Sequence, residues 1–450
     1  MIKNIFIVVL LFSFGVQAQE KSRFEKMELF NKVLYLIESQ YYREVDIDKL
    51  IQGALKVMMN TLDPHSSFLP EKVFTKMQED TKGEFGGLGI EVTQKDGMIV
   101  VIAPIEDSPA FKAGVKPGDK IVEINHDSVL GLSLEDAVDK MRGKPGTKIL
   151  VGISREGEDK VLQITLTREL IKTKPVKVTT LDKNYFYIRL ASFQKDSSKF
   201  ISKEIKKFKR TSKLHGLILD LRSNPGGLLD EAVNVSSLFL KEGIVVSTES
   251  RDPKNKEIRY VMRSGIKELK TPLIVLIDGA SASASEIVAG ALQDHGRAVI
   301  MGANSFGKGS VQSVAKIDDK KGVKLTIAQY MTPKGRKIQA LGIKPDVEIG
   351  FVDKPIDEII KEPSYIREKD LRGHLTATIE TEDEKKLRIE NEKRERLNRI
   401  AKIKASKKKK NEKEKSSDIT NRKYEPANDY QVIQALNVLK TLHFTKTPKN

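Results

Sequence analysis

The 450-residue chain contains no cysteine and no tryptophan. Without cysteine it cannot form a disulfide scaffold, a thiolate nucleophile, a cysteine-based zinc or iron–sulfur site, or a lipid anchor on an acylated cysteine. Hydrophobic residues make up 39% of the chain, which is enough for folded cores and excludes wholesale disorder. At roughly 100–200 residues per domain, the length indicates two or three domains.

The chain is strongly basic, with a formal net charge of +17, which raises the question of a nucleic-acid partner. Residues 385–415 hold fifteen Lys/Arg against five Glu and carry +10 of this charge. With few apolar residues, this segment is predicted to be a solvated helix or a disordered tether. It lacks interleaved aromatics, so an anionic envelope surface is favoured over nucleic acid as its contact, and a simple tether is favoured over both.

The N-terminus has the pattern of a signal peptide over residues 1–18. Lys3 gives a basic start, residues 5–16 are apolar, and Val16-Gln17-Ala18 fits a small-x-small cleavage site. Twelve apolar residues cannot cross a hydrocarbon core, which needs about twenty. The alternatives are a buried strand or an uncleaved anchor. A cleaved signal predicts an exported protein of the periplasm or cell envelope.

Changes in hydrophobic pattern divide the rest of the chain. Residues 19–83 carry two amphipathic helical stripes, which form either a dimerisation arm or a layer packed on the core. Residues 84–168 have short β-branched runs separated by turns, and one short helix over 134–141. Residues 169–380 alternate buried-type strands (217–219, 273–277, 298–301) with helices (228–240, 284–293). A Lys/Arg-rich flexible segment, 381–425, and a C-terminal helix or tail, 426–450, complete a multidomain α/β protein.

The β-rich domain opens with the run GGLGI at residues 86–90. Consecutive glycines let backbone N–H groups converge on an anion, and a free strand edge can accept a peptide as an added strand. The runs SPAFKAG at 108–114 and PGDKI at 117–121 follow, and the set resembles a PDZ domain. Asn125 and His126 stand where that family commonly has Asn-Gly, but a left-handed turn tolerates both residues. The residues at which a protein C-terminus would bind are Gly86, Gly87, Leu88, Gly89 and Ile90.

The run SASASEI at 281–287 lies where a buried strand is predicted to end and a helix to begin. Ser283 and Glu286 fit the capping-box pattern Ser-x-x-Glu, which is a purely structural interpretation. In the functional interpretation, one serine is exposed at the turn as a nucleophile. Backbone N–H groups of the first helical turn could then stabilise an oxyanion.

A serine nucleophile needs a proton acceptor. Among the six histidines, His295 lies closest to this pattern, but its place after the helix favours a C-cap. Lys308, in the run SFGKGSVQ at 305–312, is the other candidate, because burial can lower the pKa of a lysine toward neutrality. The alternative for Lys308 is a phosphate-binding or surface loop, although no P-loop pattern precedes it. Gln312 could hold the amine if this stretch is helical.

The run LDLRSNPGG at 219–227 ends a predicted strand in a Pro-Gly-Gly turn, which is either an ordinary loop or a second oxyanion donor. Together with the serine and lysine runs, and with LDPHSS at 62–67, it resembles the bacterial carboxyl-terminal processing (tail-specific) serine peptidases. That resemblance implies an N-terminal helical region, a PDZ domain and a crotonase-like α/β protease core. No cofactor and no metal are expected. His65 is expected to be structural.

The resemblance also implies the role of each site residue. Ser283 would be the nucleophile, Lys308 the general base and Gln312 the residue that orients the base, while the backbone N–H groups of Gly227 and Ala284 would form the oxyanion hole. The expected function is an exported serine endopeptidase that recognises protein C-termini and processes or degrades envelope proteins. The alternative is a PDZ-type peptide-binding scaffold on an inactive core.

The sequence leaves two possible roles for the PDZ domain of this expected peptidase. Whether its PDZ domain inhibits or activates the core does not follow from the sequence. The expected partners are protein substrates with accessible C-termini, with a possible homodimer or oligomer formed through the terminal helices. No specific nucleic acid is expected.

Overall fold

The computed structural model describes residues 22–350 except 96, 106 and 159, residues 366–375 except 372, and residues 424–446. The predicted signal peptide and nearly all of the predicted Lys/Arg-rich segment lie outside these residues. The chain divides into two compact units between Met59 and Asn60. Among the described helices, none is both long and apolar enough to cross a membrane.

The two predicted helices are α1 (Arg23–Gln40), which lies in the first unit, and α2 (Ile47–Asn60), which lies in it except for its last residue. A capping box starts α1, in which Ser22 Oγ accepts from the Glu25 N–H and the Glu25 carboxylate accepts from the Ser22 N–H. None of the α1 residues is buried, so its apolar side chains face outward within this unit.

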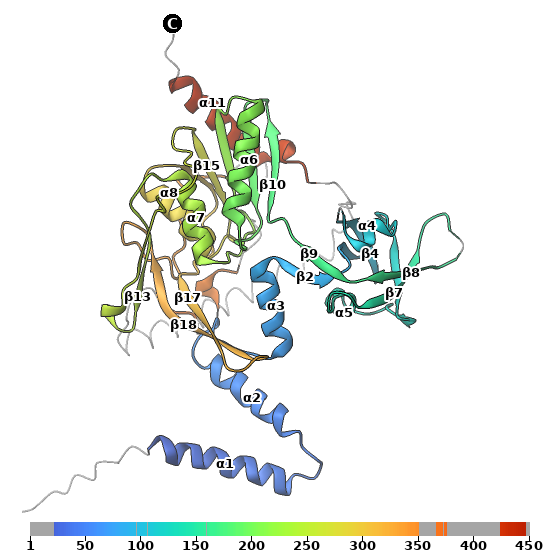
Figure 1. The fold of residues 1–450 in the computed structure, drawn as a ribbon. Helices are drawn as coiled ribbons and strands as arrows, with labels where there is room; N and C mark the ends of the chain where they lie inside the picture. Colours follow the sequence, from blue (N-terminus) through green and yellow to red (C-terminus); the bar gives the residue numbers. More distant parts are fainter. Residues whose placement is uncertain are drawn as a thin grey trace, which may run out of the picture. The chain divides into compact units, whose positions relative to one another are not determined.

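The α/β core is built on a six-stranded sheet (Figure 1). Its strands, in spatial order, are β10 (Val176–Leu181), β11 (Tyr185–Leu190), β12 (Gly216–Asp220), β15 (Leu273–Ile277), β16 (Val299–Gly302) and β19 (Val347–Glu348). All neighbours from β11 to β19 pair in parallel, and β10 is an antiparallel edge. The strands predicted at 217–219, 273–277 and 298–301 are therefore confirmed as the centre of the sheet.

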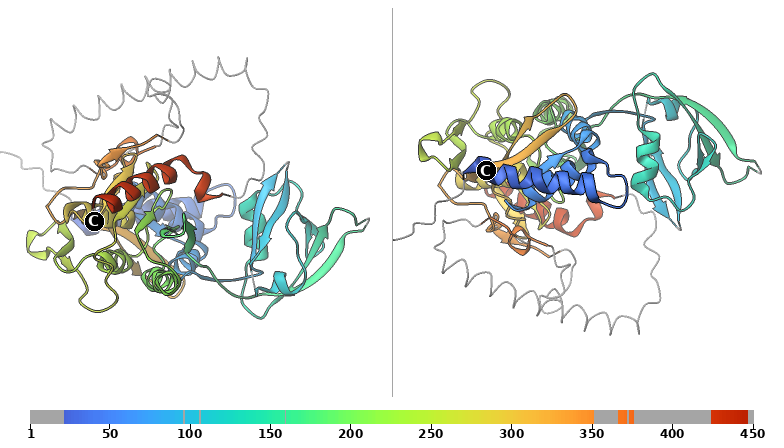
Figure 2. Two further views of the ribbon diagram at one scale, coloured as in Figure 1. Left: turned by 90° about the horizontal axis from the view of Figure 1, so that it is seen from above. Right: turned by 90° about the horizontal axis from the view of Figure 1, so that it is seen from below.

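Helices cover both faces of this sheet. Side chains that alternate along each strand therefore pack into two hydrophobic cores, one on each face. Leu217 and Leu219 pack with α6 (Ser197–Thr211), α7 (Leu229–Phe239) and α8 (Ala284–Asp294). Ile218, between them, faces the other side, where it meets α11 (Tyr430–Lys446). Figure 1 and Figure 2 show α11 lying along that side. The predicted C-terminal helix thus docks on the core.

The β-rich domain has the predicted strands and helix. Its sheet has the order β3 (Ile90–Lys95), β4 (Met98–Pro104), β5 (Lys120–Ile124), β7 (Lys148–Ser154) and β8 (Leu162–Thr167), with β6 (Asp127–Ser128) on β5. Its helices are α4 (Pro109–Lys112) and α5 (Leu134–Met141). Asn125 and His126 have φ of 51° and 68°, which confirms the left-handed turn. Exposed apolar side chains of this domain include Ile102 and Phe111.

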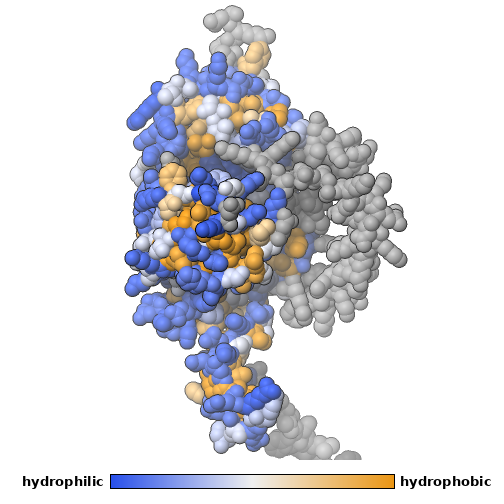
Figure 3. Space-filling model, turned by 90° about the vertical axis from the view of Figure 1, so that its right-hand side faces the viewer, coloured by the Kyte–Doolittle hydropathy of each residue, from blue (hydrophilic) through white to orange (hydrophobic). Residues whose placement is uncertain are grey.

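Two further sheets are present. The five-stranded sheet contains β1 (Ser67–Leu69), β18 (Gly322–Met331), β13 (Ile244–Ser250), β14 (Ile258–Tyr260) and β17 (Ser310–Lys316), and the two-stranded sheet contains β2 (Glu84–Gly87) and β9 (Glu169–Lys172). Helix α3 (Glu71–Lys82) and the short 3-10 helices η1 (Pro253–Asn255), η2 (Glu368–Asp370) and η3 (Pro426–Asn428) complete the described elements. Figure 3 shows a group of hydrophobic residues in the middle of the face it draws, with hydrophilic residues around them.

Candidate active site

Three loops that carry the predicted catalytic residues leave one edge of the central sheet. The loop 221–228 follows β12, the turn 278–283 follows β15, and the loop 303–309 follows β16. These three strands are parallel neighbours, so their carboxyl ends lie side by side. That edge is where ligands bind in open α/β sheets.

Ser283 is the accessible serine of the SASAS turn. Ser281 and Ser285 are both 0% exposed, and their hydroxyls donate to the carbonyl oxygens of Leu221 (2.8 Å) and Asn224 (2.9 Å). Ser283 is only partly buried and has φ 54° and ψ −112°, a conformation that non-glycine residues rarely adopt. Such strain costs about 1–3 kcal/mol and is found mainly at functional sites.

Glu286 joins the serine turn to the lysine loop. Its Oε2 accepts from the backbone N–H of Ser283 (2.8 Å) and from that of Lys308 (2.9 Å). Its Oε1 accepts from the hydroxyl of Ser305 (2.5 Å) and the N–H of Gly307 (2.7 Å). Glu286 is fully buried, and burial raises its pKa to about 7 against these four hydrogen bonds. The capping-box prediction identified Glu286 but missed its bonds to the lysine loop.

Lys308 has the environment of a candidate base. Burial lowers its pKa, and the positive charge of Lys324 lowers it further. The carboxylates of Glu368, Glu286 and Asp63 act in the opposite direction, but the net pKa lies below that of an ordinary lysine. A larger fraction of neutral amine is therefore available to accept a proton.

Gln312 lies on strand β17, so the helical geometry considered for this stretch is wrong. Its side-chain amide donates to the Ser310 hydroxyl over 2.7 Å. β17 pairs along its length with β18, and the register shifts between Val311 and Gln312. The pairing with β18 decides the local structure, which a spacing of four residues could not reveal.

The Pro-Gly-Gly turn lies against the serine turn. A Cβ on Gly226 would lie 2.8 Å from the Ser283 Cβ and 3.0 Å from the Ala284 nitrogen. The N–H groups of Gly227 and Ala284 donate no hydrogen bond within the described part of the chain. Asn224 stabilises the turn, since its Oδ1 accepts a hydrogen bond from the Gly226 N–H over 2.9 Å. Two N–H donors are therefore unpaired within the described residues, one in the residue that follows Ser283 and one in the residue that follows Gly226.

The histidines serve other contacts. His295 ends α8 as its C-cap, as predicted, and its Nε2 lies 2.7 Å from the Ile244 carbonyl oxygen. His65 Nε2 lies 2.7 Å from an oxygen of the fully buried Glu368, which also accepts from the Gln339 amide. The Gln339 Oε1 in turn accepts from the Gly309 N–H, next to Lys308. No sequence pattern pointed to Glu368 or Gln339.

The predicted peptide-binding run spans the end of one strand and the start of another. Gly86 and Gly87 pair with β9 as part of β2, and Ile90 starts β3, which is an edge strand. A Cβ on Gly86 would lie 2.1 Å from the Gly143 carbonyl oxygen, and Gly89 has φ +72°. Glycine is therefore required at both positions, and the β3 edge is available for an added strand.

Comparison with known proteins identifies the family. Residues 184–349 match peptidase family S41, residues 86–166 match the PDZ domain, and residues 13–73 match the activating protease CtpB N-terminal domain. A carboxy-terminal-processing protease of Bartonella bacilliformis is 43% identical over 367 residues, which cover 81% of this chain and 83% of the relative. The chain belongs to the carboxy-terminal processing protease family.

A second curated relative agrees with this membership. The carboxy-terminal processing protease CtpA of Bacillus subtilis is 35% identical over 333 residues, 74% of this chain and 70% of the relative. A solved photosystem II D1 C-terminal processing protease is 29% identical, covers 72% of this chain and 93% of its own, and has a TM-score of 0.42. The predicted fold class of this carboxy-terminal processing protease, a PDZ domain with an α/β protease core, is confirmed.

Proposed function

We propose that this protease is an exported serine endopeptidase that binds protein C-termini through its PDZ domain and cleaves with Ser283 and Lys308. The observation that carries the proposal is the Glu286 oxygen that accepts from the backbone N–H groups of both residues. The strained backbone of Ser283 and the lowered pKa of Lys308 support the same pair.

The proposed reaction is acyl transfer. The neutral amine of Lys308 takes the hydroxyl proton of Ser283 as Oγ attacks the scissile carbonyl carbon. The N–H groups of Gly227 and Ala284 stabilise the oxyanion. The Lys308 ammonium then protonates the leaving amine as the C–N bond breaks. Water then attacks the ester carbonyl carbon and loses a proton to the Lys308 amine. As the bond to Oγ breaks and the new C-terminus is released, the Lys308 ammonium returns that proton to Ser283 Oγ. Gln312 is proposed to orient the amine.

Substrate recognition is proposed at the edge of β3. The substrate's last residues would add as an antiparallel strand, with the terminal carboxylate near the backbone N–H groups of 86–89. Deleting 84–168 and measuring cleavage of an unstructured protein distinguishes the possible roles of this domain. A faster reaction means that it inhibits the core, and a slower one that it activates the core or recruits substrate.

The test of the dyad uses purified Ser283→Ala and Lys308→Ala with a substrate that carries an apolar C-terminal tail. Both should lose cleavage, whereas Ser313→Ala, an exposed serine on β17, should retain it. A fluorophosphonate probe should label the wild-type protein and Ser313→Ala, but not Ser283→Ala. Cleavage by Ser283→Ala at the wild-type rate would exclude the proposed nucleophile, and an unlabelled, inactive wild type would favour a peptide-binding scaffold.

Export and assembly are also proposals, based on the two ends of the chain and on its Lys/Arg-rich segment. Protein recovered from the cell envelope should begin near residue 19 if the signal is cleaved. Removing 19–59 or 426–450 should lower the oligomeric mass if terminal helices form a homodimer or oligomer. Salt-sensitive binding to anionic vesicles, lost on deleting 385–415, would support an envelope-surface role for that segment.

A further inference from the structure

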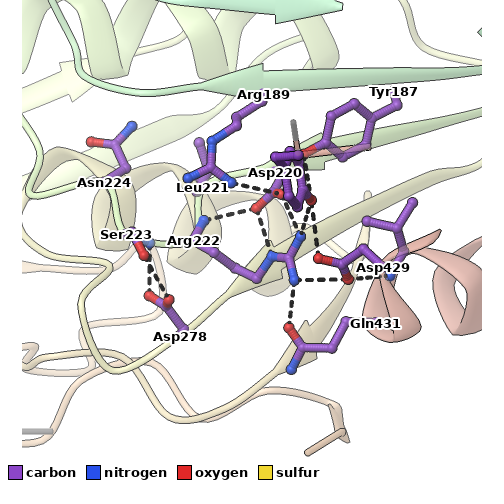
Figure 4. A network of polar contacts seen from close by, with 12 residues as sticks. Tyr187, Arg189, Asp220, Leu221, Arg222, Ser223, Asn224, Asp278, Asp429 and Gln431 are labelled. Atoms are coloured by element: carbon purple, nitrogen blue, oxygen red, sulfur yellow. Dashed lines mark hydrogen bonds and ion pairs between the residues drawn. The ribbon is translucent and has the colours of Figure 1, made fainter. Parts of the chain in front are cut away.

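The C-terminal helix touches the loop that carries the proposed oxyanion donor. Helix α11 lies beyond residues 184–349, the span that matches the peptidase family. Val432, Ala435 and Leu439 pack into the core on the sheet face opposite α7 and α8. At its N-terminal end, this helix also meets Arg222, five residues before Gly227 (Figure 4).

All five N–H donors of the Arg222 guanidinium are used. Nε donates to Asp220 Oδ1 (3.0 Å), and one Nη2 hydrogen bond goes to Asp220 Oδ2 (2.7 Å). The other three reach residues of the C-terminal segment: Nη2 to the Tyr424 hydroxyl (3.0 Å), and Nη1 to Asp429 Oδ1 (3.1 Å) and Gln431 Oε1 (2.7 Å). The segment thus supplies most of the partners of a side chain that is only 6% exposed.

Asp429 has two roles at this contact. Its Oδ1 also accepts from the Val432 N–H, so it caps α11 while it pairs with Arg222. Burial alone would raise the pKa of Asp429, but the hydrogen bond and charge of Arg222 lower it overall. Gln431 is 1% exposed, and its side-chain N–H donates to the Ile349 carbonyl oxygen (2.8 Å). This hydrogen bond orients the side-chain oxygen of Gln431 toward Arg222.

The loop between Arg222 and Gly227 transmits this contact to the site. Ser223 has φ 54°, and its N–H and hydroxyl both donate to the Asp278 carboxylate. Asn224 donates from Nδ2 to the Leu190 carbonyl oxygen and accepts from the Gly226 N–H. Ser223, Asn224 and Gly226 are hydrogen-bonded, and the ring of Pro225 restricts its backbone, so little of this short path is free to absorb a shift of Arg222 before it reaches Gly227.

We propose that Asp429 and Gln431 are positioning residues that act through Arg222 to hold the oxyanion loop, so that the docked C-terminal helix is required for full catalytic rate. The inference rests on the proposed function, because it assumes that Gly227 donates to the oxyanion. Without these two acceptors, the Nη1 group of the buried Arg222 guanidinium has no hydrogen-bond partner. The guanidinium then moves toward other acceptors and displaces the loop to which Arg222 belongs.

The test compares three single variants of the full chain and the double variant Asp429→Ser/Gln431→Leu. Asp429→Ser keeps an N-cap residue but cannot reach Arg222, and Gln431→Leu keeps the volume without the acceptor. Lys440→Gln is the matched control, since it removes the ion pair of α11 with Asp182 at the other end of the helix. Thermal unfolding, kcat, KM and the rate of Ser283 labelling by a fluorophosphonate are measured well below the lowest Tm.

The expected result is a fall in kcat of about tenfold or more for Asp429→Ser and for the double variant, with KM nearly unchanged, because small displacements at a catalytic centre cost up to about a hundredfold. Labelling of Ser283 should slow in parallel, and Lys440→Gln should lower Tm while kcat stays at the wild-type value. A wild-type kcat in the double variant, or an equal loss in Lys440→Gln, would overturn the inference. Cleavage by Ser283→Ala would instead overturn the proposed function.

Discussion

One carboxylate oxygen, Oε2 of Glu286, accepts from the backbone N–H of Ser283 at 2.8 Å and from that of Lys308 at 2.9 Å. The two residues belong to loops that follow different strands of the sheet, so this shared acceptor fixes the spacing of their backbones. The other oxygen holds Ser305 and Gly307. Four donors therefore converge on a carboxylate that no solvent reaches.

Glu286→Gln should damage both the site and the fold. An amide nitrogen would replace one oxygen and face two donors, which leaves buried N–H groups without an acceptor. The expected cost is about 1–3 kcal/mol of unfolding free energy, with a loss of kcat of at least about tenfold. Urea unfolding and steady-state kinetics measure the two effects.

A variant of another residue on the same helix is the control for Glu286→Gln. Gln293→Ala removes exposed hydrogen bonds near the C-terminal end of α8 and should leave kcat unchanged. If Glu286→Gln lost stability but kept the wild-type kcat, Glu286 would be structural only.

The central strands were predictable because the sheet is buried on both faces, which requires continuous apolar runs such as 217–219 and 273–277. Ser283 and Lys308 could be named as candidates because short motifs carry the chemistry proposed for them. The contact of Glu368 with His65 was not, since the two lie far apart in sequence and meet only in the folded chain. The second role of Glu286 was hidden for the same reason.

The rate should rise with pH through the pKa of Lys308, because only the neutral amine accepts the serine proton. That pKa is lowered, so the midpoint in kcat/KM should lie below 10.5. The unfolded state binds the lysine proton more tightly, so this group makes stability rise with pH between the lowered pKa and 10.5. A pH–rate profile and urea unfolding across this window measure both effects.

Two neighbouring charges should move this midpoint in opposite directions. Lys324→Gln removes a charge that lowers the pKa of Lys308, so the midpoint should move to higher pH. Glu368→Gln removes a charge that raises the pKa, so the midpoint should move to lower pH. Lys203→Gln, on the exposed side of α6, controls for net charge. Shifts of the same sign would contradict the assignment of Lys308 as the base.

Gly226→Ala should separate local crowding from backbone strain. The new Cβ would meet the Ala282 carbonyl oxygen and the Ser283 Cβ, each at 2.8 Å, at a φ of +102°. Gly335→Ala is the matched control, since it has φ +80° and nothing within 4 Å. Both should lose about 1–2 kcal/mol of stability to the left-handed backbone, but only Gly226→Ala should lose kcat, by about a hundredfold. An equal kcat in the two variants would mean that the Gly226 contact does not position the site.

Ser283 itself provides a test of stored strain that needs no substrate. Because φ is 54° and ψ −112°, glycine should fit this position better than alanine. In urea unfolding, the unfolding free energy of Ser283→Gly should therefore exceed that of Ser283→Ala by about 1 kcal/mol. Ser313, in the regular part of strand β17, should show the usual order, with the alanine variant more stable than the glycine variant. If alanine were the more stable residue at both positions, the turn would hold no strain, and its geometry could not be part of how Ser283 is presented to a substrate.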